Sequence, residues 1–261
     1  MKIGGQRIHK LTDTDKARQL FGGWEETIIW SCLQGVMGCI YADDDRHPCS
    51  AAATLGDFAF FAGRPWRELI LHKPEGHPAD FIIMVPENDE WGRMIESCYK
   101  ERAKKVSRYA IKKELKVFDR EKLKKMRDFL PDGYVLKLID EDIYEQCKEQ
   151  QWSRDLVSQY PDYGTYQRLG LGVVVQKDGR VVSGASSYSS YEGGIEIEID
   201  TDEPYRRRGL ASACAAGLIL ECLKRDLYPS WDAQNKWSVA LAEKLGYHYS
   251  HEYTAYEIWG Y

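Results

Sequence analysis

The chain has 261 residues, which is enough for two domains of modest size or for one large domain with a substantial core. Its 43% hydrophobic and 30% charged residues are typical of an ordinary globular protein, and its formal net charge of −5 gives no support to nucleic acid as the main partner. We expect a cytoplasmic protein that meets no membrane. The cysteines are scattered without a CxxC pair, the N-terminus has no apolar signal segment, and no uncharged run is long enough to span a membrane.

The first 130 residues alternate between short helical and strand-like patterns, which predicts an α/β domain. Asp, Pro and Gly separate the apolar runs, and Asp119 is placed to begin the last helix. The expected order is helix 12–21, strands 38–43, 50–55 and 57–63, helix 65–73, strand 80–85, helix 88–103, strand 106–113 and helix 119–130. The sequence LPDGY at 130–134 interrupts this pattern, so we expect domains at 1–130 and 131–261.

A basic strip runs from Ser97 to Arg127, with 13 Lys or Arg against 4 acidic residues. Such a strip is usually a solvated face of the protein. The other interpretation is that it meets an anionic partner.

The second domain has a regular pattern. We expect the order β-α-β-β-β-α-β-α-β, with a hairpin at Lys177-Asp178-Gly179 and a strand of strict period two at 194–201. A long apolar helix follows from about residue 207 to 225, then the short strand YPSWD at 228–232, a helix that begins at Asn235 and a terminal strand at 252–259. We predict that Cys214 and Cys222 pack in the core of this domain.

Three arginines, Arg206 to Arg208, stand directly before the long apolar helix. Because a helix N-terminus carries partial positive charge, cations there are unfavourable unless an anion binds nearby. Unpaired N–H groups at such an end bind phosphate, and Gly209 and Ala211 would let a phosphate approach the backbone closely. We interpret Arg206-x-x-Gly209-x-Ala211 as a pyrophosphate site. The alternative is a basic helix end without a ligand.

Two segments of this domain resemble the GNAT superfamily of acetyl-CoA-dependent N-acyltransferases. They are YRRRGLA at 205–211 and NKWSVALAEKLGY at 235–247, an Asn-led helix that ends in Lys-Leu-Gly-aromatic. The resemblance covers residues 134–261. It implies an α/β (α+β) fold with a mixed, mostly antiparallel sheet flanked by helices, and acetyl-CoA as co-substrate. The length and tail of the chain also resemble the subgroup that contains the zwittermicin A self-resistance acetyltransferase.

The resemblance implies a role for each matching residue. The N–H groups from Arg207 to Ala211 would hold the CoA pyrophosphate, and the strand end from Ile199 to Thr201 would pair with the pantetheine arm. One amide of that strand would polarise the thioester carbonyl, and Asn235 would bond the arm near the last helix. The expected CoA-binding residues are Ile199, Asp200, Thr201, Arg206, Arg207, Arg208, Gly209, Leu210, Ala211, Asn235 and Ser238.

A carboxylate is needed to accept the proton of the attacking amine, directly or through water. Strand alternation puts Glu196, Glu198 and Asp200 on one face. The family's usual base comes from this strand, so Glu198 is the first candidate and Glu196 the second. The alternative is that these side chains simply face water.

The family's usual proton donor to the leaving thiolate is a tyrosine in the last helix. Ala242 occupies that position in this chain. The role would therefore pass to another group, such as Tyr247 or a water, or the thiolate would leave without a donor.

The first domain repeats part of the order of the second, including an Asn-led helix at Asn88. We interpret it as a degenerate GNAT-like copy, the alternative being an unrelated α/β domain. Pro65 lies in its equivalent turn and has no N–H for a phosphate, so we expect this domain to shape the acceptor pocket and not to hold CoA.

We therefore expect an enzyme that moves an acetyl group from acetyl-CoA to a primary amine of a small molecule, an antibiotic among the candidates. The aromatic and acidic stretches at 41–45 and 151–155 would suit a cationic acceptor, although either is also typical of a solvated loop. The alternative function, favoured by Ala242 and the basic strip, is a non-catalytic module that binds acyl-CoA or a partner. We expect a monomer or homodimer and no metal site.

Overall fold

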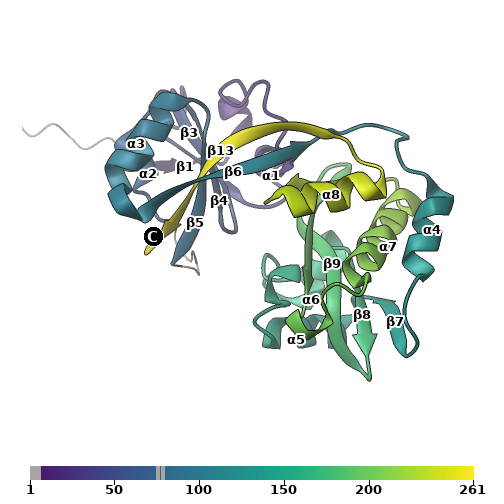
Figure 1. Ribbon diagram of the computed structural model, residues 1–261. Helices are drawn as coiled ribbons and strands as arrows, with labels where there is room; N and C mark the ends of the chain where they lie inside the picture. Colours follow the sequence, from purple (N-terminus) through teal and green to yellow (C-terminus); the bar gives the residue numbers. More distant parts are fainter. Residues whose placement is uncertain (1–6, 75–76, 78–79) are drawn as a thin grey trace, which may run out of the picture. The chain divides into compact units, whose positions relative to one another are not determined.

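The computed structural model describes residues 7–74, 77 and 80–261 as a mixed α/β protein, with strands in sheets that are flanked by helices (Figure 1). The chain divides into two compact units. Unit 1 contains the described residues up to Arg108 together with Glu252–Tyr261, and unit 2 is Tyr109–His251.

The elements of the first half begin with a short strand and continue to a strand that leads into unit 2. In chain order they are β1 (His9–Lys10), η1 (Thr14–Ala17), α1 (Thr27–Gln34), β2 (Cys39–Ala42), β3 (Ser50–Leu55), β4 (Phe58–Gly63), α2 (Arg67–Ile70), β5 (Phe81–Pro86), α3 (Asp89–Tyr99), η2 (Lys100–Arg102) and β6 (Ala103–Ile111).

The second half contains the longest helix. Its elements are α4 (Arg120–Asp128), β7 (Tyr134–Leu138), α5 (Glu141–Glu149), η3 (Arg154–Leu156), α6 (Tyr163–Leu169), β8 (Gly172–Lys177), β9 (Arg180–Tyr191), β10 (Gly194–Thr201), η4 (Glu203–Tyr205), α7 (Leu210–Lys224), β11 (Tyr228–Ser230), β12 (Asp232–Ala233), α8 (Lys236–Leu245) and β13 (Tyr249–Trp259).

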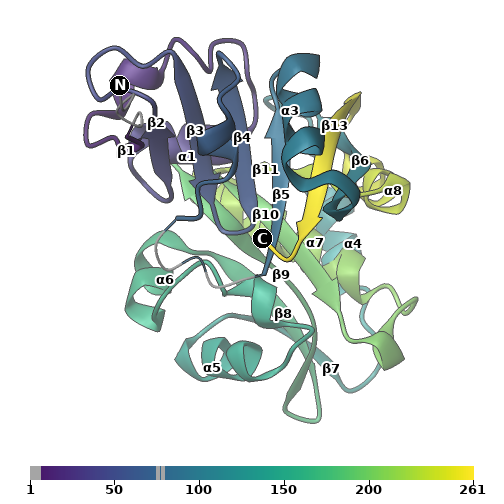
Figure 2. The ribbon, with the colours of Figure 1, turned by 90° about the vertical axis from the view of Figure 1, so that its left-hand side faces the viewer.

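In unit 1, β1 to β4 form an antiparallel series, and β4 then pairs with β5 in parallel. Strand β13 pairs with the other edge of β5, where Ile258 lies opposite Ile82 (Figure 2). Fully buried side chains such as Trp91 and Met84 pack with Ile258 in the core of this unit. The last residues of the chain are therefore part of the first unit's sheet.

In unit 2, β7 to β10 form an antiparallel series, and β10 pairs with β11 in parallel. Helix α7 packs on one face of this sheet with α4 beside it, and α5 and α6 lie on the other face (Figure 1). Cys214 and Cys222 of α7 are fully buried in the core, as predicted. Each unit thus combines an antiparallel series with one parallel pair.

The two units do not divide where the sequence pattern changes. With the expected boundary at residue 130, the strand at 252–259 would belong to the second domain. The compact units instead divide between Arg108 and Tyr109 and again between His251 and Glu252, so this strand belongs to unit 1. The reason is a strand exchange: β13 joins the sheet of unit 1, while Tyr109 and Ala110 at the end of β6 pair with β12 in unit 2.

Most expected elements are present. The order predicted for the second half is matched except that a further helix, α6, follows α5 and that the segment 228–232 forms two strands, β11 and β12, in place of one. The segment expected as a helix at 12–21 contains only the 3₁₀ turn η1, and α1 was not predicted. Within the described residues, no helix combines the length and apolar character needed to cross a membrane.

Candidate functional site

The segment YPSWD, expected as one strand, consists of two short strands that belong to different sheets. Strand β11 pairs with β10 only from Gly194 to Glu196, and after Trp231 the chain turns away to pair with β6 as β12. Strand β10 keeps its pairing with β9 as far as Thr201. The parallel strands β10 and β11 therefore diverge just after Glu196.

The two faces of β10 differ in character, as the alternation predicted. Ile195 and Ile197 are buried in the core beneath α7, and Ile199 packs against it. Of the carboxylates, Glu196 is 7% exposed and lies opposite Ser189 and Ser230, whereas Glu198 is half-buried. Glu198 is thus the first carboxylate beyond the point where the strands diverge.

Asp200 lies further along β10, near the loop that carries the three arginines. Burial raises the pKa of Asp200, while its Thr201 N–H donor and the Arg206 guanidinium, 3.9 Å away, act in the opposite direction. Asp155 of η3 raises the pKa further, so part of the acidic stretch 151–155 lies near the carboxylate face of β10. The stretch 41–45 belongs to unit 1, where Asp43 accepts hydrogen bonds from Cys49 N and Ser50 N.

Helix α7 begins without a side-chain cap. Asn or Asp side chains accept N–H bonds at the starts of α3, α4, α5, α6 and α8, whereas the N-cap of α7 is Gly209, with φ 81°. The first N–H groups of a helix have no partner within it, so those of α7 are directed at whatever lies in front of the helix. A Cβ placed on Gly209 would meet no atom within 4 Å, which leaves that approach open.

The three arginines before α7 have different surroundings. Arg206 donates from Nε to the Thr201 carbonyl at 3.1 Å, and Arg208 donates to Tyr134 Oη at 3.1 Å and to the Pro204 carbonyl at 3.0 Å. Arg207 is exposed and has φ 62°, and none of the side-chain bonds found among the described residues involves its guanidinium. Arg207 is therefore the arginine most available to an anion.

A pocket of about 520 Å³ opens beside the start of α7. Gly209 and Ser212 form part of its wall, α4 forms another part, and Lys244 from the end of α8 completes it. The predicted pyrophosphate site therefore borders a cavity large enough for part of a nucleotide.

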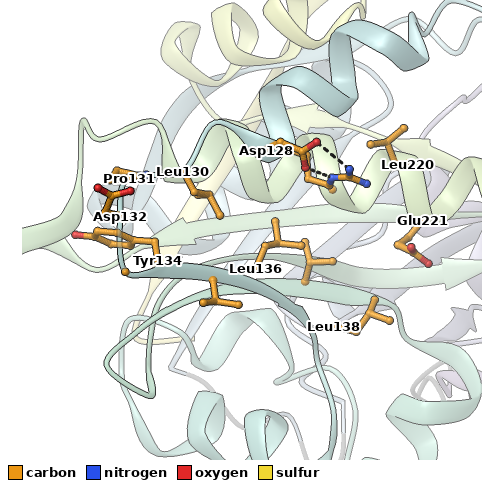
Figure 3. A pocket seen from close by; sticks show the side chains of 14 residues that line it. Asp128, Leu130, Pro131, Asp132, Tyr134, Leu136, Leu138, Leu220 and Glu221 are labelled. Atoms are coloured by element: carbon orange, nitrogen blue, oxygen red, sulfur yellow. Dashed lines mark hydrogen bonds and ion pairs between the residues drawn. The ribbon is translucent and has the colours of Figure 1, made fainter.

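A second cavity of about 620 Å³ lies along the outer strand β7 (Figure 3). Leu136 and Leu138 line it from β7, and Leu220 and Glu221 line it from the C-terminal half of α7. Because neither Gly209 nor Ser212 borders this cavity, it lies apart from the predicted phosphate site.

Asn235 and Ser238 lie at the start of α8, where Asn235 Oδ1 accepts from Ser238 N at 3.0 Å and Ser238 Oγ accepts from Trp231 Nε1 at 3.0 Å. These bonds link the helix start to Trp231, the residue between β11 and β12. Thr201 is less suited to pair with a pantetheine arm, because its N–H already donates to Asp200 Oδ1 at 2.6 Å and its carbonyl accepts from Arg206 Nε.

Ala242 is fully buried in the core of unit 2. The proposed substitute, Tyr247, is also buried, and its hydroxyl donates to the Pro229 carbonyl at 2.6 Å. Burial raises the pKa of Tyr247 well above its ordinary value. A hydroxyl held in this way is poorly placed to protonate a thiolate.

A buried tyrosine–serine network behind β9 was not predicted. Tyr160 Oη lies 2.6 Å from Ser187 Oγ, and Tyr166 Oη lies 2.8 Å from Ser186 Oγ. Burial raises the pKa of both tyrosines, so these hydroxyls stay protonated and fix the segment around η3 and α6 against the sheet. The only signal in the sequence was the unusual serine content of 183–190.

The equivalent place in unit 1 is closed by its own side chains. Gly63 at the end of β4 donates its N–H to Glu87 Oε2 at 2.9 Å, and its carbonyl accepts from Trp91 Nε1 at 2.9 Å. Pro65 follows in the turn, and the helix after it, α2, spans only Arg67–Ile70. Within the described residues of both units, no group of three or more His, Cys, Asp or Glu side chains could hold a metal ion.

Comparison with known proteins identifies a family that extends over nearly the whole chain. The family model of GNAT acetyltransferase matches residues 18–256. The chain is 31% identical over 247 residues to the uncharacterized N-acetyltransferase YdfB of Bacillus subtilis (strain 168), covering 88% of this chain and 89% of YdfB.

Solved structures give the same result. A GCN5-related N-acetyltransferase-like protein from Streptococcus suis 89/1591 is 50% identical, with a TM-score of 0.89, over 94% of this chain and 98% of that one. A tandem GNAT protein from the clavulanic acid biosynthesis pathway shares only 10% identity but covers 98% of both chains with a TM-score of 0.55, which shows a similar fold in a two-domain arrangement. The chain belongs to the GNAT acetyltransferase family.

Proposed function

We propose that the protein is an acetyl-CoA-dependent N-acetyltransferase that acts on a primary amine of a small molecule. The observation that carries the proposal is the start of α7: a long buried helix begins at Gly209 with no side-chain cap, directly after the strand that diverges from its parallel neighbour. In a member of this family, that combination supports a diphosphate at the helix and an acyl group beside β10.

The residues present fit acetyl-CoA. The N–H groups from Gly209 onward face an open approach, and Arg207 has no competing bond among the described residues. We assign the diphosphate to the Arg207–Ala211 backbone and the pantetheine arm to β10 near Ile199, with Asn235 beside it. When bound, acetyl-CoA supplies an activated thioester carbonyl.

The chain's own residues would then deprotonate and orient the amine. We assign the base to Glu198, because it is half-buried and lies two residues beyond Glu196, the last residue of β10 that pairs with β11. Glu196 remains the second candidate. Asp155 and Asp200 add negative charge on this face, which favours a cationic acceptor.

The test is the release of free CoA thiol from acetyl-CoA across a panel of amines. We expect turnover on at least one amine, and Glu198→Gln should lower kcat about a hundredfold, because general-base catalysis contributes on that order. The affinity for CoA, measured by calorimetry, should stay unchanged in this variant because the diphosphate site lies at α7.

Glu192→Gln is the matched control, since it makes the same chemical change in the turn between β9 and β10. It should leave both measurements as in the wild type. If Glu198→Gln retains full kcat, Glu198 is not the base.

One observation favours the other function, a non-catalytic acyl-CoA-binding module. Ala242 leaves the family's usual acid position without a proton donor, and Tyr247 is engaged with Pro229. Binding of CoA without turnover on any amine or peptide would establish this second function in place of the first.

Several expectations stay predictions. They are the antibiotic-resistance subgroup, the cytoplasmic location, the monomeric or homodimeric state, the absence of nucleic-acid and membrane partners, and the role of the N-terminal domain in shaping the acceptor pocket.

A further inference from the structure

The pocket beside Gly209 continues away from the start of α7 along helix α4. Gly209 and Ser212 line it at the start of α7, Lys122 and Lys125 line it from α4, and Phe129 lines it directly after α4. In coenzyme A the diphosphate joins two different parts, a pantetheine arm and a 3′-phosphorylated adenosine. If the arm follows β10, the adenosine must leave the diphosphate in another direction, and this pocket borders the same helix start.

The charges of the pocket suit an anion. Lys122, Lys125 and Lys244 line it, and their ammonium groups take part in none of the ion pairs found within the described residues. The two acids in the wall are already engaged: Asp119 caps α4 by accepting from Glu121 N and Lys122 N, and Glu121 pairs with Lys124 at 2.7 Å. The three lysines outnumber the two acids of the wall, and one of these acids already pairs with Lys124, so the pocket keeps a net positive charge.

The pocket also has an apolar part. Phe129 is 77% exposed, which is unusual for a large aromatic side chain, and Met126 lies one turn before it on α4. A flat aromatic ring at the edge of a cationic pocket is suited to a nucleobase, because every base offers a π-face for stacking. The combination of lysines and an exposed ring matches a phosphorylated nucleoside better than it matches inorganic phosphate alone.

We propose that this pocket holds the 3′-phosphoadenosine end of the coenzyme, and that Lys122, Lys125 and Lys244 select donors that carry the 3′-phosphate. The assignment rests on the proposed function, because it extends the same ligand from the start of α7. It gives a role to part of the basic strip, which otherwise is a solvated face.

Calorimetry with CoA and with 3′-dephospho-CoA tests the selection. The wild-type chain should prefer CoA by about tenfold, which corresponds to about 1.4 kcal/mol. The triple variant Lys122→Ala, Lys125→Ala, Lys244→Ala should lose most of this preference. Its affinity for 3′-dephospho-CoA should stay within about twofold of the wild-type value, a difference of ~0.4 kcal/mol.

Lys124→Ala is the matched control, because Lys124 lies on the same helix but pairs with Glu121 and does not line the pocket. It should retain the wild-type preference. Phe129→Ala should weaken binding of both nucleotides, whereas Leu115→Ala, which removes another highly exposed apolar side chain outside the pocket, should not.

The outcomes separate the two proposals. If CoA binds to the wild type and the triple variant keeps the full preference for the 3′-phosphate, the pocket assignment is wrong and the proposed function stands. If neither nucleotide binds to the wild-type chain, the proposed function fails and this assignment fails with it.

Discussion

Gly209 leaves the approach to the N-terminus of α7 open. Its φ of 81° is a conformation that side chains rarely adopt, and the space in front of it is open. Arg206 stabilises the loop by its bond to Thr201, and Arg207 contributes the free positive charge. A diphosphate here would offset the unfavourable placement of cations at a helix start.

We predict that Arg206→Glu combined with Gly209→Val weakens CoA binding by at least about tenfold, or about 1.4 kcal/mol. The valine side chain would enter the approach to the N–H groups, and the glutamate would repel the diphosphate. Calorimetry measures the affinity, and circular dichroism checks that the variant is folded.

The hairpin between β8 and β9 offers a matched control for this double variant. Gly179 has φ 78° and open space around its Cβ position, and Arg180 follows it. Arg180→Glu with Gly179→Val should therefore impose similar strain without changing CoA affinity. Unchanged CoA affinity in a folded Arg206→Glu, Gly209→Val variant would show that the diphosphate lies elsewhere.

The residues of the site differ in how far their positions follow from the sequence. The opposite faces of Ile197 and Glu198 follow from the two-residue period of a strand, and Gly209 follows from its place before an apolar run. The bond from Tyr247 to the Pro229 carbonyl could not be predicted, because it joins residues whose proximity depends on the tertiary fold.

At the level of elements, local patterns predicted strands well where turns separate them, as in β3 and β4. Helix α1 was missed because Glu26 gives no side-chain cap and most of its residues are buried, so the sequence lacks both a start signal and an amphipathic period. The segment YPSWD was expected as one strand, since nothing local indicates that its two parts pair with β10 and β6.

The turn after β4 and the turn before α7 lead to different predictions for ligand binding. In unit 1, Glu87 and Trp91 occupy the backbone groups of Gly63, Pro65 removes one donor, and α2 is short. We therefore predict that calorimetry on the full chain will give one CoA per chain, with the site in unit 2.

The Arg206→Glu, Gly209→Val variant tests whether the single CoA site lies at the start of α7. It should weaken the single binding event by at least about tenfold and reveal no second one. A binding event that keeps the wild-type affinity in this variant, beside the weakened one, would place a second site outside the start of α7 and contradict the prediction that unit 1 holds no coenzyme.

At the level of the whole molecule, the exchange of strands links the ends of the sequence. Residues 252–259 alternate like any strand, and this local pattern carries no information on which sheet accepts them. The expected division at residue 130 followed the change in composition, whereas the compact units follow strand pairing. The likeness in fold to a tandem GNAT structure, at 10% identity, is visible only once the structures are compared.

The strand exchange predicts that a destabilising substitution in β13 lowers the stability of unit 1. Ile258 is fully buried and lies opposite Ile82, so Ile258→Ala should cost about 2–5 kcal/mol of stability through the lost burial and the cavity left behind. Hydrogen exchange followed by mass spectrometry should show lost protection in β4 and β5, although Ile258 is far from them in sequence.

Val135→Ala, in the exposed outer strand β7, should leave these amides protected. Loss of protection confined to β10 and β11 would instead mean that the terminal strand stabilises the second unit, as a division at residue 130 requires.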